Sequence, residues 1–395
     1  MLTFDEAQNS VLALAEVLPE ERVSLAASLG RVLAADVRAP GDWPAFDAST
    51  MDGYAVRAAD VGREAMQVVG ESRAGAEAPE LVGKSACRIF TGAPMPRGAD
   101  AVIMQEDAKR EGDLVTFATK PSPGAFVRRR GDDLRAGEIA LAKGTRVSAA
   151  CVAMLASLDQ ADVAVARAPR VAIVPTGDEL RAPGAPGGPA SIAESNSPAL
   201  AAMAERAGAK VTTSAPVPDE LEHVKRAFEE ALRTCDVLVT IGGVSVGERD
   251  VVKEALDACG VALDFWRVAI KPGKPLAVGR RGATIVLGLP GNPVSAMVTF
   301  ALFGVPLLRA MQGDRDALPR PSRMKLAASF AHKTGRLELA RARVSKEGVT
   351  VLPNQASGAI VGLCRADVLA SIPADVERLE AGAEVDVLSL AELGL

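Results

Sequence analysis

The sequence is poor in histidine and in aromatic residues. Of its 395 residues only two are histidines and one is a tyrosine, and aromatic side chains make up 3%. His223 falls in an amphipathic helical pattern and His332 in a polar turn, so neither a histidine general base nor a histidine-ligated transition metal is expected. Any chemistry must therefore depend on carboxylates, lysines, backbone dipoles and bound ions.

Cysteine and export signals are also sparse. The five cysteines are scattered singly, an odd number without the spacing of disulfides or metal sites, which favours a reducing cytoplasmic location. The start, Met-Leu-Thr-Phe-Asp-Glu-Ala, has neither a basic region nor an apolar core and predicts no export signal. The longest apolar stretch, residues 294–308, is expected to be too short to span a bilayer and to form a buried helix.

Excess positive charge is absent as well. The net charge is -5, so no overall basic field attracts nucleic acid or an anionic membrane, and neither partner is expected. Hydrophobic residues make up 48% and charged residues 24%, as in ordinary globular proteins. The length predicts two to four domains, each with its own core.

The residue pattern changes twice within the first 168 residues. Residues 3–35 have helical spacing, residues 39–55 resemble a long irregular loop, and short alternating segments from 53 to 137 predict a small β-rich domain. A helix is expected again at residues 149–158. We therefore predict a helical N-terminal domain of residues 1–40 and 140–168, interrupted by an inserted β-rich domain of residues 41–139.

From Arg170 the pattern alternates between strands and helices. Apolar strands are predicted at residues 171–175, 210–215, 237–241, 265–270 and 284–287, with amphipathic helices between most of them. Such alternation predicts a doubly wound parallel sheet within an α/β multidomain protein, here in residues 169–320. Residues 321–395 alternate around turns and predict a C-terminal β-barrel domain.

Polar and glycine-rich clusters follow the predicted strands of the α/β domain. Because ligands of such sheets bind beyond the carboxyl ends of the strands, these clusters should line one crevice. They are Thr176 to Glu179, Asp219, Gly242 to Asp250, Lys271 to Lys274, and Gly288 to Asn292.

The crevice residues suit a phosphate ester bound with Mg²⁺. Carboxylates beside glycine-rich turns can share Mg²⁺ with phosphate oxygens, and lysines can neutralise the remaining charge. The candidates are Thr176, Glu179, Asp219, Gly242, Gly243, Ser245, Asp250, Lys271, Lys274 and Asn292. Purely structural roles stay open as alternatives: Asp219 and Asp250 could be helix caps, Asn292 could be a helix start, and the lysines could be solvated loop charges.

Two further motifs precede the α/β domain. Asp52 lies in the loop Ser-Thr-Met-Asp-Gly-Tyr, where the alternative is an Asx-turn. Three arginines from Arg128 precede Asp132 and Asp133, which suits oxyanion capture as well as a solvated turn.

Seven motifs together resemble those of the MoeA family of molybdopterin molybdenumtransferases, which is related to the C-terminal domain of gephyrin. In chain order they occupy residues 44–55, 90–100, 128–133, 176–180, 242–250, 271–275 and 288–295. The resemblance extends from Met1 to the last predicted strands.

The resemblance implies transfer of molybdenum from molybdate to adenylylated molybdopterin, with Mg²⁺-dependent release of AMP, in molybdenum cofactor biosynthesis. It implies a homodimer with a cleft between the α/β domain of one subunit and the inserted domain of the other, and a molybdopterin adenylyltransferase as upstream partner. By match to the family's motifs, the cleft residues are Asp52, Thr91, Arg128 and Asp133 from the inserted domain, Glu179, Asp219, Asp250 and Lys271 from the α/β domain, and Ser357 from the C-terminal domain.

We assign these residues roles as hypotheses. Glu179, Asp219 and Asp250 would place Mg²⁺ and water, Lys271 and the Gly242-Gly243 turn would hold phosphates, and Arg128 or other cations would hold molybdate. Two other functions remain open. One is a molybdopterin adenylyltransferase, which resembles the α/β domain alone, and the other is a non-catalytic dimeric scaffold.

Overall fold

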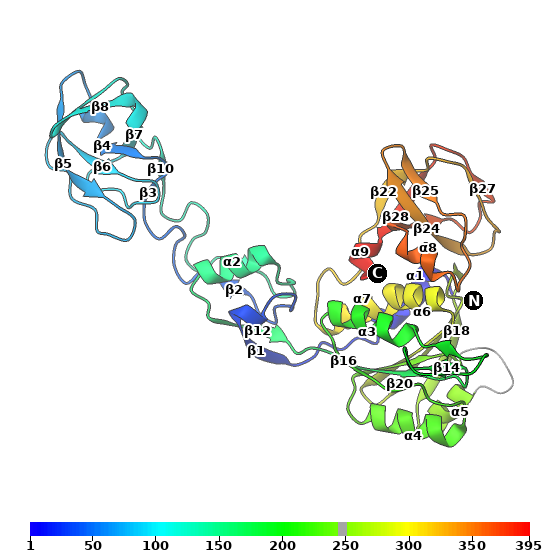
Figure 1. The fold of residues 1–395 in the computed structure, drawn as a ribbon. Coiled ribbons are helices and arrows are strands. Elements are labelled where there is room, and N and C mark those ends of the chain that lie inside the picture. The colour runs from blue at the N-terminus through cyan, green and yellow to red at the C-terminus, as the bar shows by residue number, and fades with distance from the viewer. Residues whose placement is uncertain (244–250) are drawn as a thin grey trace. The chain divides into compact units, whose positions relative to one another are not determined.

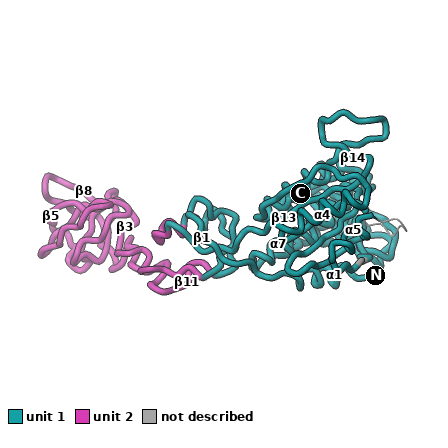
Figure 2. Tube along the Cα trace, turned by 90° about the horizontal axis from the view of Figure 1, so that it is seen from below, with its two compact units in different colours: residues 1–35, 143–153, 161–395 teal, residues 36–142, 154–160 magenta. Residues whose placement is uncertain are grey.

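The computed structural model describes residues 1–243 and 251–395. The described residues form two compact units, drawn in different colours in Figure 2. One comprises residues 1–35, 143–153 and 161–395, and the other comprises residues 36–142 and 154–160. The predicted domain boundaries stay predictions.

The larger unit contains an α/β domain built on a mixed sheet (Figure 1). The strand order is β16-β13-β17-β21-β20-β18. The bounds are β13 Arg170–Pro175, β16 Lys210–Thr213, β17 Val237–Ile241, β18 Ala262–Arg267, β20 Pro275–Arg281 and β21 Thr284–Leu289. Strands β16, β13, β17 and β21 are parallel, whereas β20 and β18 run antiparallel to their neighbours. The α/β class is confirmed, but no helix separates β18, β20 and β21, so the parallel pattern stops at this edge.

Helices cover both faces of this sheet because the strands are apolar on both sides (Figure 1). Val171, Ile173 and Val239 pack with one helical layer, and Ala172, Val174 and Leu238 pack with the other. The first layer contains α3 Asn196–Arg206, α6 Pro293–Thr299 and α7 Val305–Met311, and the second contains α4 Leu221–Leu232 and α5 Val251–Ala258.

The segment Pro293–Met311 runs as one helical stretch of 19 residues, through α6, a π-helical part at Phe300–Gly304, and α7. By length and composition it could cross a membrane, so the expectation that it is too short was wrong. Its mean hydropathy of 1.7 accompanies 83% burial within the protein. The expected buried helix is confirmed.

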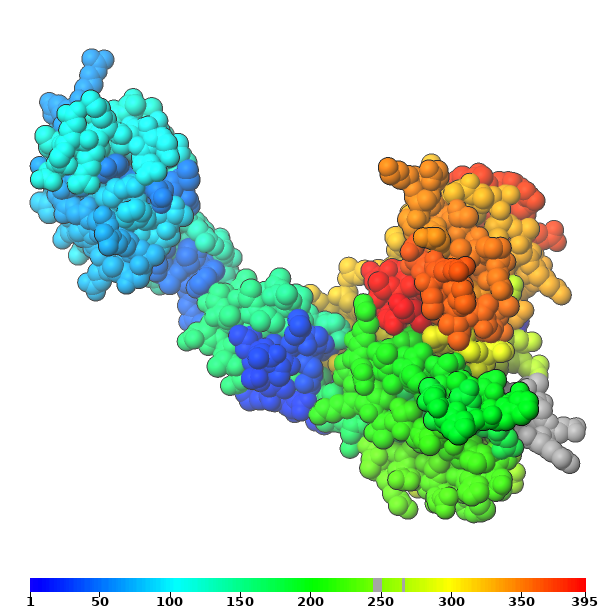
Figure 3. All heavy atoms as spheres, in the orientation of Figure 1, coloured from blue at the N-terminus to red at the C-terminus, as the bar shows by residue number. Residues whose placement is uncertain are grey.

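The C-terminal strands close into a small barrel. Strand β24 (Leu337–Ser345) pairs with β25 (Gly348–Val351) and β26 (Val368–Ile372), β26 pairs with β28 (Glu384–Ser389), and β28 pairs with β22 (Ser322–Lys325). The bridge between Leu326 and Val349 then joins β22 back to β25. Strand β19 (Ile270–Lys271) of the α/β domain pairs with β24. In Figure 3 the orange and red atoms of this barrel lie against the yellow atoms of the long helix.

The N-terminal segment is less helical than predicted. Helix α1 (Phe4–Leu12) has a capping box between Thr3 and Glu6, but residues 20–24 form β1, which pairs with β12 (Asp162–Ala166). The expectation of helical structure over residues 3–35 was therefore wrong beyond α1, apart from a single 3-10 turn at Leu25–Ala27. Val23 alternates with exposed charged residues, as expected of a half-buried strand, and this period decides over helical spacing. Helix α2 (Ala149–Ser157) was correctly predicted.

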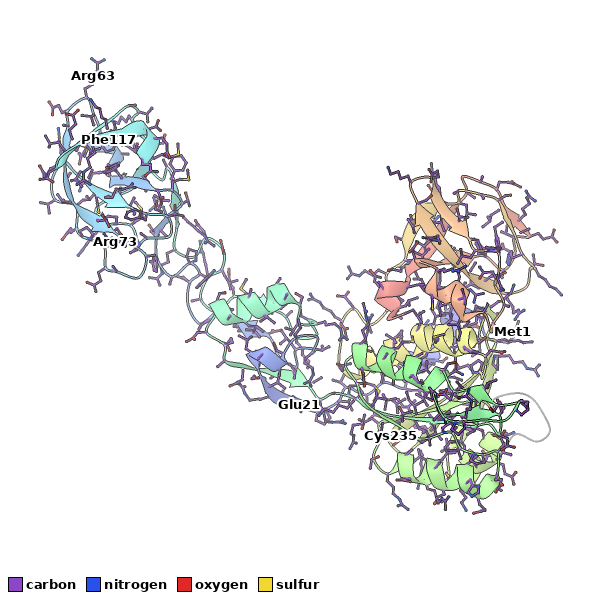
Figure 4. The ribbon with its side chains drawn as sticks, viewed as in Figure 1. Met1, Glu21, Arg63, Arg73, Phe117 and Cys235 are labelled. Atoms are coloured by element: carbon purple, nitrogen blue, oxygen red, sulfur yellow. The ribbon has the colours of Figure 1, made fainter. Side chains whose placement is uncertain are left out.

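The smaller unit is β-rich, as predicted. Its sheet has the order β7-β4-β6-β5-β9-β8, and the strands β2 Val37–Arg38 and β3 Ala48–Ser49 pair with β11 Ile139–Leu141 and β10 Val127–Arg128. The sheet comprises β4 Gly53–Val56, β5 Met66–Ser72, β6 Ser85–Ile89, β7 Ala101–Met104, β8 Ala108–Glu111 and β9 Leu114–Phe117. Phe117, labelled in Figure 4, packs edge-on against Tyr54 with ring centroids 5.8 Å apart.

Candidate functional site

A pocket of about 400 Å³ lies at the carboxyl edge of the parallel strands. It begins where β13, β17 and β21 end, and the starts of α3 and α6 form its other walls. Its lining is Thr176, Glu179, Leu180, Ile192, Ala193, Glu194, Ser195, Asn196, Ile241, Gly242, Gly291, Asn292 and Pro293. Four predicted residues, Thr176, Glu179, Gly242 and Asn292, are thus brought together. Parallel strands end on one edge, which is why residues far apart in the sequence meet here.

Glu194 and Asn196 hold the α3 side of the pocket, and sequence reasoning missed both. The Glu194 Oε1 atom accepts the amide hydrogens of Asn196 and Ser197, at 2.7 and 2.9 Å, and so caps α3. Asn196 Nδ2 donates to the Gly291 carbonyl at 2.8 Å, which joins α3 to the turn before α6. Helix α3 begins at Asn196, and Ser195 occupies its N-cap position. The signal available was an acidic residue two positions before the helix.

Three carboxylates gather beside this pocket. The amide of Asp219 donates to Asp178 Oδ1 at 3.0 Å, and Glu179 follows in the same turn after β13. Burial raises the pKa of Asp219, and the negative charges of Asp178 and Glu179 raise this pKa further. The Asp219 side chain is not a helix cap, because Glu220 occupies the N-cap of α4. Crowded carboxylates of this kind favour a bound cation.

Gly242 begins the glycine turn after β17. Its φ angle is +91°, and a Cβ atom there would lie 2.9 Å from the Thr176 carbonyl oxygen. Gly243 also has a positive φ, of +62°. The remaining predicted residues of this turn, Ser245 and Asp250, lie outside the described residues.

We expect Gly242→Ala to destabilise the protein by about 1–3 kcal/mol, because alanine is strained at this φ and its Cβ meets backbone that cannot move aside. Urea unfolding measures the loss. The matched control is Gly260→Ala, which has a positive φ of +72° but nothing within 4 Å of the added Cβ. Equal losses in the two variants would show that the contact with Thr176 has no effect.

Lys271 ends β19, and Lys274 lies in the connection from β19 to β20, at the same edge of the sheet. Lys271 Nζ is 2.8 Å from Glu338 Oε1, so this lysine is not a solvated loop charge. Lys274 is exposed, and its carbonyl accepts the amide hydrogen of Val268. Gly273 keeps the loop close to α6, since a Cβ there would lie 2.3 Å from Thr299 Oγ1.

Ser357, from the C-terminal domain, contacts the start of α6 but does not line the pocket. Its carbonyl accepts the amide hydrogen of Val294 at 3.0 Å, next to Asn292 at the N-cap of α6. That amide is therefore already bonded. The buried Arg341 holds this loop by donating to the carbonyls of Asn354 and Ala356. An arginine within an apolar strand gave no sequence signal for this role.

In the smaller unit, Asp52 and Thr91 are brought together. Asp52 Oδ1 accepts hydrogen bonds from the Thr91 amide and hydroxyl, at 2.7 and 2.9 Å. These bonds, the amide first, lower the pKa of Asp52, and the charge of Arg88 lowers it slightly more. The partner lies 39 residues away, so Asp52 does not form the local Asx-turn that was the alternative.

The predicted arginine run is paired with acids of the same unit. Arg128 forms an ion pair with Asp133, its predicted neighbour in the site. Arg129 and Arg130 pair with Asp47 and Asp42, each at 2.7 Å. These pairs reduce the positive charge that the run offers to an oxyanion.

The structure gives partial support for a metal site. Within residues 1–243 and 251–395, no group of three or more histidine, cysteine, aspartate or glutamate side chains has the geometry of a metal site. Of the three predicted ligands, Glu179 and Asp219 lie near each other, and Asp250 is outside the described residues.

Comparison with known proteins accounts for almost the whole chain. The MoeA N-terminal region (domain I and II) matches residues 2–158, a probable molybdopterin binding domain matches residues 172–310, and the MoeA C-terminal region (domain IV) matches residues 323–390. The chain belongs to the MoeA family.

Relatives agree over the full length. A molybdopterin molybdenumtransferase of Haemophilus influenzae is 38% identical and covers 86% of this chain and 85% of the relative. Molybdopterin molybdenumtransferase 2 of Mycobacterium tuberculosis is 36% identical over 99% of this chain and 100% of the relative. Among solved structures, a molybdopterin biosynthesis MoeA protein of Pyrococcus horikoshii has a TM-score of 0.85 at 30% identity, covering 98% and 100% of the two chains. The predicted family and fold class are thus confirmed.

Proposed function

We propose that this protein is a transferase that inserts molybdenum from molybdate into adenylylated molybdopterin, with Mg²⁺-dependent release of AMP, in molybdenum cofactor biosynthesis. Its relatives of the MoeA family carry the corresponding name over the same length. The observation that carries the proposal is the carboxylate group of Asp178, Glu179 and Asp219 beside the pocket at the strand ends. A molybdopterin adenylyltransferase would require only the α/β domain and would leave the matched N- and C-terminal regions without a role.

The pocket is suited to a phosphate ester. Gly242 lets the backbone come close to a ligand, and Lys274 is an exposed cation at the same edge. Lys271 would contact phosphate oxygens from its place beside Glu338. Glu194 and Asn196 hold the start of α3 against the turn before α6, so the pocket walls are ordered before a ligand binds.

The carboxylates fit Mg²⁺ as the resident cation. Glu179 and Asp219 would hold it, because burial and the charges of Asp178 and Glu179, which raise the pKa of Asp219, make an ionised Asp219 costly, and a divalent charge would offset that cost. When bound, Mg²⁺ would neutralise phosphate oxygens as the phosphoanhydride is cleaved. Asp178 would orient the Asp219 segment through its bond to the Asp219 amide.

Molybdate is the second substrate. The dithiolene sulfurs of molybdopterin provide ligands for molybdenum, which is consistent with a chain that needs no cysteine or histidine ligand set. The oxyanion would be held by cations of the cleft, and Arg128 would share its charge between molybdate and Asp133.

We further propose that the protein acts as a homodimer in the cytoplasm, receiving its substrate from a molybdopterin adenylyltransferase. In this assembly Asp52, Thr91, Arg128 and Asp133 of one subunit would face the pocket of the other. The bonds from Thr91 keep the Asp52 carboxylate fixed and ionised. A fixed anion is suited to orienting a cation or a substrate hydroxyl across the cleft.

The test is AMP release from adenylylated molybdopterin with Mg²⁺, with molybdate, with sulfate, and with neither. We expect release that depends on both Mg²⁺ and molybdate, followed by liquid chromatography of the nucleotide. Sulfate is the control because it has the same charge and shape but cannot accept dithiolene ligands. If the protein bound the nucleotide but released no AMP with molybdate, the transferase function would be rejected.

A further inference from the structure

A buried acidic residue and a buried histidine lie behind Lys271. Strand β19 runs parallel to β24, and their register places Lys271 beside Glu338. The Lys271 ammonium is 2.8 Å from Glu338 Oε1. The Glu338 side chain is 3% exposed, whereas that of Lys271 is 40% exposed. The carboxylate is therefore held inside the protein, and the lysine extends from it toward solvent.

His332 contacts the other oxygen of the same carboxylate. Its Nδ1 atom is 3.3 Å from Glu338 Oε2, and the imidazole is 1% exposed. Neither atom has a hydrogen-bond partner elsewhere in the described chain. The Nε2 atom lies 2.5 Å from the Val376 carbonyl, which can only accept, so this nitrogen carries a hydrogen. Phe330 stacks on the ring, with centroids 6.4 Å apart.

These contacts determine where a proton must lie. A neutral His332 with its hydrogen on Nε2 would turn a lone pair toward the Glu338 carboxylate, and two buried acceptors would face each other. A proton between Nδ1 and Oε2 removes this conflict. The Lys271 ammonium lies on the other oxygen of the carboxylate, and the shared proton leaves the Glu338–His332 pair without net charge. The three groups then carry a net charge of +1.

We propose that Glu338 and His332 are positioning residues for Lys271, which fix its ammonium at the phosphate-binding edge while His332 offsets the charge of Glu338. A lysine stem is flexible and loses rotamer entropy when it binds a phosphate. Glu338 restricts that stem before the ligand arrives. The proton shared with His332 prevents Glu338 from cancelling the attraction of Lys271 for an anion. This inference rests on the proposed function for its catalytic consequence, but not for the anchoring itself.

The first arm of the test measures anchoring without any substrate. An acetylating reagent reacts with the unprotonated amine of an accessible, mobile lysine, and peptide mass spectrometry gives the rate at each lysine. We expect Glu338→Gln to raise the acetylation rate of Lys271 several-fold, with the exposed Lys109 as internal reference. The matched control is Glu380→Gln, which removes an exposed ion pair with Arg378 from the same barrel. An unchanged rate at Lys271 in Glu338→Gln would overturn the proposal.

The second arm measures AMP release in a double-mutant cycle. We expect Glu338→Gln to reduce molybdate-dependent release by about 10- to 100-fold, because an ammonium that is slightly misplaced no longer meets the reacting phosphate. In the Lys271→Met background, Glu338→Gln should reduce AMP release little further, because the ammonium that Glu338 positions is absent. If the losses of AMP release from Glu338→Gln and Lys271→Met multiplied in the double variant, the role of Glu338 would be purely structural and the proposal would be overturned.

Two further results keep the test decisive. If Glu338→Gln does not fold, Glu338→Asp keeps the charge but withdraws it from the ammonium, and it should give the same changes to a smaller degree. His332→Gln should reduce release without raising Lys271 acetylation as much, because the anchor remains but its charge is no longer offset. A wild-type protein that releases no AMP would reject the proposed function, while the acetylation arm would still decide whether Glu338 anchors Lys271.

Discussion

Replacing Asp219 with asparagine should reduce molybdate-dependent AMP release by about 100-fold or more, since one carboxylate of the proposed cation site is lost at the point where charge develops. The variant keeps the size of the side chain and the backbone bond from the Asp219 amide to Asp178. AMP release at saturating Mg²⁺ and a titration of Mg²⁺ measure the two consequences. We expect a slower rate at saturating Mg²⁺ and weaker binding of Mg²⁺, seen as a higher Mg²⁺ concentration at half-maximal release.

The same substitution should not destabilise the protein at neutral pH. Burial and neighbouring carboxylates raise the pKa of Asp219 in the folded state, so the folded protein holds this proton more tightly than the unfolded chain does. Its ionised form therefore opposes folding above the folded pKa, and this cost disappears below the unfolded value of about 4. Asparagine removes the charge permanently.

Thermal unfolding of Asp219→Asn should accordingly give a Tm equal to or above that of the wild type at pH 7 without Mg²⁺, and no such advantage near pH 3. Added Mg²⁺ should raise the Tm of the wild type and reverse the order. The control is Glu222→Gln, an exposed carboxylate in the first turn of α4. A variant that lost activity and stability together at every pH would indicate structural damage instead.

Replacing Arg341 with methionine should destabilise the protein by about 2–4 kcal/mol, because the carbonyls of Asn354 and Ala356 would lose, in partly buried positions, the hydrogen bonds that the buried guanidinium donates. Arg341 is 2% exposed and also bonds Gln355 Oε1. Methionine fills much of the volume, so the loss measures the hydrogen bonds more than a cavity. Denaturant unfolding gives the free energy.

The loss should extend to function through Ser357. Arg341 holds the loop whose Ser357 carbonyl accepts the Val294 amide beside the pocket. We therefore expect weaker nucleotide binding in Arg341→Met even at temperatures where the protein stays folded. The control is Arg343→Met, in the same strand but exposed. If both variants were equally stable, the loop would not depend on Arg341.

Local sequence patterns predicted most of the fold because they depend on short-range physics. The apolar run of residues 237–241 followed by Gly242 predicted a buried strand and a turn; the structure confirms the strand, and Gly242 and Gly243 both have positive φ, while the rest of the predicted turn lies outside the described residues. The strand–helix alternation also predicted which residues share an edge of the sheet, and Thr176, Glu179, Gly242 and Asn292 do line one pocket. Neither conclusion needs contacts beyond neighbouring elements, since parallel strands must end together.

Long-range pairing decided the rest. Residues 20–24 have enough helical spacing to suggest a helix, but β12, more than 130 residues later, supplies the strand partner that fixes them as β1. In the sequence the arginine run from Arg128 suited oxyanion capture as well as a solvated turn, and only the fold shows that Asp133, Asp47 and Asp42 pair with it.

The sequence by itself determined the kind of chemistry that this protein can perform. Its scarcity of histidine and its carboxylates and lysines after successive strands restrict the site to anions and hard cations. Only the tertiary structure decided which of these groups act on one another. Lys271 meets Glu338 and His332 because β19 leaves its own domain to pair with β24, a register that no local pattern encodes. Side-chain identity sets the available charges, whereas packing between distant segments sets their partners.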